Sequence, residues 1–170
     1  MNSTKRIALI GVFTALYFVL SAMLKIPIAG HITLDLGYIA LTVSAVFLGG
    51  LPAMTVGILG AFLESAVLSQ KGVSLGWCLM NAVVGYACGA VLYRTSELGR
   101  KKFLVSAALV IPLSMLIGVV AKTFVDCALY DVALIAKIPS STAAWITDSA
   151  VMLVIGIPLS MALKNRLKHV

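Results

Sequence analysis

The stretch FLVSAALVIPLSMLIGVVA, residues 103–121, decides the fold class because it contains no Asp, Glu, Lys or Arg. Residues 7–24 and 72–93 are also free of these four residue types. A helix needs about 20 apolar residues to cross the hydrocarbon core of a bilayer, and these stretches have that approximate length. The chain as a whole is 61% hydrophobic and 11% charged, with a mean hydropathy of +1.09. We therefore predict an integral membrane protein.

The remaining sequence adds three more helices. Residues 36–70 carry a single acid and are too long for one span, and they are divided at residues 49–52 by the sequence Gly-Gly-Leu-Pro. Proline is favoured at helix starts and glycine at helix ends. Residues 149–163 are free of charge and form a full span together with 142–148. We predict an all-α membrane protein with six transmembrane helices in one domain, residues 1–170.

The expected elements are a helix from about Arg6 to Lys25, a first loop from Ile26 to Thr33, helices at Leu34–Gly49, Pro52–Ser69 and Ser74–Tyr93, a long helix from Phe103 to Tyr130, an outer loop with Asp131, Lys137 and Pro139, and a last helix capped by Ser140, Ser141 or Thr142. The first apolar run is followed at once by further spans, so we do not expect a cleaved signal peptide.

The distribution of basic residues predicts the orientation, because short cytoplasmic loops are enriched in Lys and Arg. One side of the predicted bundle carries nine of the 13 basic residues: Lys5, Arg6, Arg94, Arg100, Lys101, Lys102, Lys164, Arg166 and Lys168. The other side carries Lys25, Lys71 and Lys137, and Lys122 lies within a span. We therefore expect both termini in the cytoplasm. The same distribution explains the net charge of +7 without any nucleic-acid partner.

Charged and polar side chains within the apolar segments suggest a binding pocket. A charge at the bilayer centre costs about 2.5–3.5 kcal/mol or more, so such residues are usually functional. With the predicted orientation, those of this chain share the outer half of the membrane. The expected pocket residues are Glu64, Trp77, Asn81, Lys122, Asp126, Trp145 and Asp148. The alternative is a structural network in which these residues satisfy one another, and Lys122 and Asp126 have the i,i+4 spacing of a helical ion pair.

Small residues recur at every fourth position of the helices expected at 52–69 and 74–93, and we interpret these stripes as packing within the molecule. The sequence contains no HExxH, GxSxG or P-loop motif, and its three cysteines show no metal-binding spacing. We therefore expect no catalytic residues, no metal and no cofactor. An ion pathway is disfavoured because the inner half of the predicted bundle is almost free of polar side chains.

The opening RIALIGVFTALYFVLSAMLKIPI, residues 6–28, and the segment GHITLDLGYIALTVSAVFLGGLPAMTVGILGAFLESAVL, residues 30–68, resemble a known family. The chain is similar over its whole length to the S components, the substrate-binding subunits, of energy-coupling-factor (ECF) vitamin transporters. The resemblance implies capture of a vitamin at the outer face of a bacterial cell membrane. It also implies docking onto a transmembrane coupling subunit, with uptake driven by two ATPase subunits.

The resemblance also implies roles for residues outside the pocket. The small-residue motif of the family's first helix matches Gly11 and Ala15, with Ala8 one turn earlier, and these residues are expected to dock on the coupling subunit. The first loop, with His31 and Asp35, is expected to gate the pocket. The alternative to this interpretation is a small membrane protein of another class, such as an enzyme, an assembly factor or an ion pathway. The pocket candidates sum to a charge of −2, which fits a neutral, hydroxyl-rich or cationic ligand better than an anion.

Overall fold

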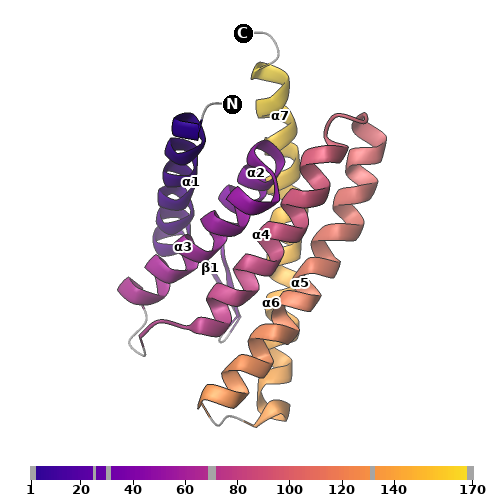
Figure 1. Ribbon diagram of the computed structural model, residues 1–170. Coiled ribbons are helices and arrows are strands. Elements are labelled where there is room, and N and C mark those ends of the chain that lie inside the picture. The colour runs from indigo at the N-terminus through magenta and orange to yellow at the C-terminus, as the bar shows by residue number, and fades with distance from the viewer. Residues whose placement is uncertain (1–2, 25, 30–31, 69–71, 131–132, 168–170) are drawn as a thin grey trace.

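The computed structural model describes residues 3–24, 26–29, 32–68, 72–130 and 133–167. The helices in chain order are α1 (Ser3–Met23), α2 (Gly37–Leu48), α3 (Gly50–Leu68), α4 (Leu75–Thr95), α5 (Arg100–Tyr130), α6 (Leu134–Val151), the π-helical turn η1 (Met152–Gly156) and α7 (Ile157–Leu167). Because α6, η1 and α7 follow one another without a break, the described chain forms six rods (Figure 1). The predicted helical membrane fold is confirmed.

Five of these rods are long and apolar enough to cross a membrane, whereas α2 is shorter. Its 12 residues rise by about 18 Å, which is less than a hydrocarbon core of about 30 Å. Helix α2 is instead almost completely enclosed by protein, with Tyr38, Ala40 and Leu41 fully buried. It packs against α1, α3, α4 and the η1–α7 segment and forms the centre of the core.

Close packing of α3 on α4 depends on the small-residue stripes, and the interpretation of these stripes as internal packing is confirmed. A Cβ atom added to Gly57 would lie 2.5 Å from the carbonyl oxygen of Asn81, and one added to Gly85 would lie 2.5 Å from that of Ala53. Both distances are far shorter than a van der Waals contact, so only glycine permits this approach. The turn between α2 and α3 is equally tight, because it consists of Gly49 alone, with φ of 84°.

Two predicted boundaries were wrong. The first loop is not irregular throughout, because strands β1 (Ile26–Ala29) and β2 (Ile32–Leu34) pair as an antiparallel hairpin. The last helix begins at Leu134 rather than at residues 140–142, so Lys137 and Pro139 lie in α6 and not in a loop. Pro139 is the sixth residue of α6 and has no N–H, so the helix lacks one intrahelical hydrogen bond there.

Figure 1 shows both chain ends at the same end of the bundle, with the β hairpin toward the opposite end. This arrangement follows from an even number of rods, and it is compatible with either orientation in a membrane. The placement of both termini in the cytoplasm therefore stays a prediction from the basic residues.

Candidate functional site

Helices α1, α3 and α4 bring buried polar side chains together beside the hairpin, at the end of the bundle that lies away from the termini. The centre of this polar cluster is Glu64, whose residue surface is 4% exposed. Its Oε2 atom accepts a hydrogen bond from Trp77 Nε1 at 3.1 Å and lies 3.0 Å from Ser21 Oγ. Ser21 Oγ is also 2.6 Å from Asp35 Oδ1. One carboxyl group thus links three helices and the segment that follows β2.

Asp35 fixes the entry into α2. Its Oδ1 atom accepts a hydrogen bond of 2.8 Å from the backbone N–H of Gly37, in an Asx-type turn. The side chain is 3% exposed, and a Cβ atom at Gly37 would lie 2.9 Å from Ser21 Oγ. The structure therefore places Asp35 at the fixed base of the hairpin. Its partner in the predicted gate, His31, lies outside the described residues.

An aromatic group extends the cluster toward α2 and deeper into α4. Tyr17 donates a hydrogen bond of 3.0 Å to Asn81 Oδ1, while Asn81 Nδ2 donates to the carbonyl oxygen of Trp77 at 3.0 Å. The ring of Tyr38 lies edge-on to Tyr17 and to Trp77, with centroid distances of 6.3 Å in both pairs. Edge-to-face pairs at this distance are favourable and hold the rings in defined orientations. The indole of Trp77 is the member of this group that is only half-buried.

Lys122 and Asp126 form the ion pair that their spacing predicts, but the pair has a third member. Lys122 Nζ lies 3.0 Å from Asp126 Oδ2, and Lys137 Nζ from α6 lies 3.2 Å from the same oxygen. The acid is almost completely buried, whereas the two lysine side chains are 24% and 28% exposed. Lys122 Nζ also lies 5.9 Å from the centroid of the Trp77 ring, which is within cation–π range. Lys122 therefore joins this ion triad to the aromatic group.

The other oxygen of Asp126 shows how closely the triad packs on α4. Oδ1 is buried and has no hydrogen-bond partner among the described residues. A Cβ atom at Gly76 would lie only 2.5 Å from it. Gly76 thus makes room for the carboxylate, and the same contact leaves no room for another group beside Oδ1.

The two remaining pocket candidates lie on α6. Asp148 is 2% exposed and interacts electrostatically with both Tyr38 and Tyr17. It therefore faces the aromatic group. Trp145 instead donates its indole N–H to the carbonyl oxygen of Pro112 at 2.8 Å and lines an apolar cavity of about 250 Å³ between α5 and α6. The structure thus brings Glu64, Trp77 and Asn81 into one network, which Lys122 and Asp148 adjoin.

Sequence reasoning missed four members of this site: Tyr17, Ser21, Tyr38 and Lys137. Tyr17 and Ser21 are, with Thr14, the buried residues of α1, and their spacing of three and four residues places them on one helix face. This periodic spacing of hydroxyl groups in an apolar helix is a readable signal. Lys137 gave no such signal, because its contact with Asp126 depends on the unexpected first turns of α6.

Comparison with known proteins identifies the family. The model of the family described as "ECF-type riboflavin transporter, S component" matches residues 1–165. The chain belongs to this family. As an S component it is a multi-pass membrane protein and a transporter subunit rather than an enzyme. The family therefore replaces the alternatives of a membrane enzyme, an assembly factor or an ion pathway.

The fold agrees with this assignment. The chain is similar to a structure titled "Structure and mechanism of the S component of a bacterial ECF transporter", with a TM-score of 0.67 and 19% sequence identity over 99% of this chain and 98% of that chain. It is also 30% identical over 88 residues to a UPF0397 protein of Onion yellows phytoplasma (strain OY-M). That match spans 52% of this chain and about half, 47%, of the relative.

The residues predicted to dock on a coupling subunit lie on the outer face of this S component. Ala8, Gly11 and Ala15 of α1 are all exposed, on the side away from buried Thr14 and Tyr17. A Cβ atom at Gly11 would have no neighbour within 4 Å. The stripe on α1 therefore differs from the stripes on α3 and α4, which are filled by other helices, and its docking role stays a prediction.

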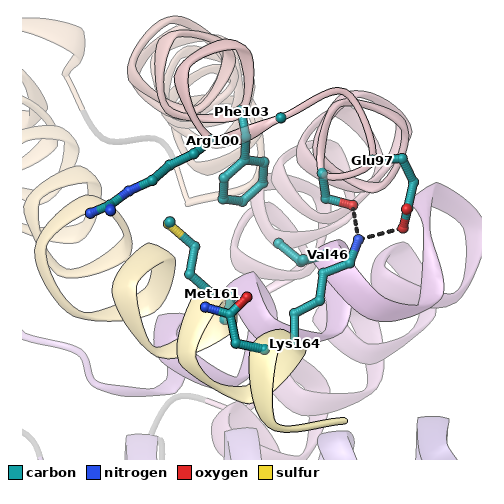
Figure 2. A pocket seen from close by; sticks show the side chains of 10 residues that line it. Val46, Glu97, Arg100, Phe103, Met161 and Lys164 are labelled. Carbon is teal, nitrogen blue, oxygen red and sulfur yellow. Dashed lines mark hydrogen bonds and ion pairs between the residues drawn. The ribbon is translucent and has the colours of Figure 1, made fainter. Parts of the chain in front are cut away.

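A separate polar cavity is lined by residues of α7 and of the loop after α4 (Figure 2). It has a volume of about 180 Å³ between the end of α2, the α4–α5 loop and α7. Lys164 spans one side and donates hydrogen bonds to Ser96 Oγ at 2.7 Å and to Glu97 at 2.5 Å. This contact joins the last helix to the loop after α4, and we assign it a structural role. Among the described residues, no group of three His, Cys, Asp or Glu side chains is placed to hold a metal ion.

Proposed function

We propose that this S component captures riboflavin, or a vitamin of the same chemical class, from outside the cell. The observation that carries the proposal is the half-buried Trp77 ring, held between the polar cluster of Glu64 and the ion triad of Lys122. Riboflavin combines a flat heteroaromatic ring with a chain of hydroxyl groups. A stacking surface flanked by a few fixed polar groups suits such a molecule.

The charges around this surface support a neutral, hydroxyl-rich ligand. Asp126 is paired with two lysines, and Glu64 and Asp35 already accept hydrogen bonds from the protein. The acids are thus committed to internal contacts, and Lys122 remains partly exposed beside Trp77.

The transport cycle that we propose follows from the two faces of the molecule. With both termini in the cytoplasm, the hairpin and the polar cluster face outward, and the hairpin with His31 and Asp35 covers the bound vitamin. The exposed stripe of Ala8, Gly11 and Ala15 then docks on a transmembrane coupling subunit, because small side chains allow helices to approach closely in lipid. Two ATPase subunits of that complex supply the energy, since this chain has no nucleotide-binding motif.

Riboflavin fluorescence tests the proposal directly. Titration of the purified protein with riboflavin should quench flavin fluorescence as the ring stacks on Trp77, and Trp77→Leu should weaken binding about tenfold or more by loss of the stacking surface. The control is Phe62→Leu, an aromatic residue of α3 that is 46% exposed on the outside of the bundle. A panel of other vitamins follows in a thermal-shift assay. Stabilisation by a different vitamin and none by riboflavin would replace the proposed substrate.

A further inference from the structure

A groove lies where α1 and α3 begin and α4 ends. It is separate from both the polar cluster and the cavity of Figure 2. Its volume is about 540 Å³, and its floor is the glycine turn between α2 and α3. Gly89 of α4 lies directly against this turn, because a Cβ atom at Gly89 would lie 2.7 Å from the carbonyl carbon of Gly49. These glycines therefore let α4 pack directly on the turn, and the groove lies over this contact.

The walls of the groove combine positive charge with aromatic rings. Arg6 from the first turns of α1 and Arg94 from the last turn of α4 line it, and the described lining contains no Asp or Glu. Glu97, the acid nearest to Arg94 in the sequence, contacts Lys164 instead. The rings are those of Tyr86 and Tyr93, which are 50% and 51% exposed.

The position of the groove along the membrane spans indicates which kind of molecule can bind there. Helices α3 and α4 are membrane spans, and the groove lies at their ends, where the hydrocarbon core gives way to the headgroup region. Exposed tyrosines are typical of this interface, since the ring sits in the apolar region and the hydroxyl group in the polar one. Leu51, which is 62% exposed, continues the surface toward the apolar side. A molecule that is apolar at one end and anionic at the other matches this order of groups.

We propose that the groove formed by Arg6, Arg94, Tyr86, Tyr93 and the Gly49–Gly50 turn binds the headgroup of an anionic phospholipid. The two guanidinium groups contact the phosphate, and the acyl chains run along Leu51 into the bilayer. Basic pockets between membrane helices at the cytoplasmic face are suited to such headgroups. In the proposed orientation the groove lies in the cytoplasmic leaflet.

Native mass spectrometry of the purified full-length protein tests this site with phosphatidylglycerol and phosphatidylcholine as probes. Wild-type protein should retain phosphatidylglycerol in preference to phosphatidylcholine. The double variant Arg6→Gln/Arg94→Gln should lose about thirtyfold in phosphatidylglycerol affinity, because each basic residue near an anionic lipid surface contributes about 1 kcal/mol. The control Lys101→Gln/Lys102→Gln removes the same charge from the first turn of α5 and should retain the lipid. Arg6→Lys/Arg94→Lys keeps the charge and should retain most of the binding.

Three results would overturn the proposal. Equal losses in the Arg6/Arg94 and Lys101/Lys102 variants would show a diffuse attraction to the basic face. A thermal stabilisation by inorganic phosphate as large as that by phosphatidylglycerol, and lost in the same variant, would show a site for soluble anions. If the Arg6→Gln/Arg94→Gln variant retained the lipid but failed to assemble with a coupling subunit, the groove would be a protein-docking surface. Riboflavin binding is measured on the same variants, so a wrong substrate and a wrong lipid site remain distinguishable.

Discussion

The ion triad of Lys122, Asp126 and Lys137 predicts a specific pattern of non-additivity. If Lys122→Met is made alone, Lys137 still neutralises the carboxylate, and the reverse holds for Lys137→Met. Both lysines are partly exposed, so each single change should lower the free energy of unfolding by about 1 kcal/mol. The double change leaves Asp126, whose side chain is 5% exposed, without a cation. Removal of the partner of a buried charge costs about 3–5 kcal/mol. We therefore expect a coupling energy of about 1–3 kcal/mol.

Thermal unfolding of the protein in detergent measures this pattern. For a chain of this size, 1 kcal/mol corresponds to about 2–4 °C in melting temperature. The single variants should therefore lose about 2–4 °C and the double variant roughly 6–20 °C. Adding Asp126→Asn to the double variant should recover most of the loss, because the uncompensated charge disappears. A double variant whose shift equals the sum of the single shifts would refute the triad as a shared ion pair.

The same variants decide whether the triad belongs to the binding site. Lys122 lies beside the Trp77 ring, so its loss should weaken ligand binding about tenfold to a hundredfold, the range of a charge-assisted contact. Lys137 has no contact with that ring among those described, so its loss should change affinity much less. Wild-type ligand affinity in the triple variant would show that the triad is purely structural and would remove Lys122 and Asp126 from the site.

Two further predictions concern the outer surface of the bundle. Gly11→Leu should abolish transport but leave ligand affinity and melting temperature unchanged, because a side chain at Gly11 would meet no neighbour. The control Gly57→Leu should destabilise the fold by at least about 1–3 kcal/mol through overpacking against α4. A loss of ligand binding in Gly11→Leu equal to the loss of transport would argue against a docking role. The orientation can be tested with single cysteines at Leu98 and Ile135, which are 60% and 81% exposed, in a background without native cysteines. We expect a membrane-impermeant maleimide to label position 98 from the cytoplasmic side and position 135 from the outer side. The reverse pattern would invert the proposed orientation.

The membrane spans could be predicted from the sequence because their signal is local. Residues 72–93 and 103–121 have no charge to place in lipid, and a helix is the way for such a segment to satisfy its own backbone. The internal packing of α3 and α4 was also predictable, since small residues at every fourth position mark one face of each helix, although the sequence did not say which helices meet. These predictions needed only periodicity and composition, which a single sequence contains.

The partners of the buried polar residues could not be predicted in the same way. Lys122 and Asp126 are neighbours on one helix, so their contact followed from spacing alone. The contact of Lys137 with Asp126 depends on how α6 packs on α5 and on a helix that continues through Pro139. Ser21 likewise meets Glu64 only because α1 crosses α3 at one particular rotation. Such contacts are set by tertiary packing, which cannot be derived from the periodicity and composition of a single sequence.

The packing also separates the roles of two residues that the sequence treated as equals. Asp126 has one oxygen shared by two lysines and the other pressed against Gly76, so neither oxygen is open to a ligand. Lys122 is partly exposed and lies at the face of Trp77. A lysine beside an aromatic surface needs a fixed position to recognise a ligand, and Asp126 supplies it by drawing the ammonium group to one place. We therefore interpret Asp126 as the residue that positions Lys122, and Lys122 and Trp77 as the pair that faces the vitamin.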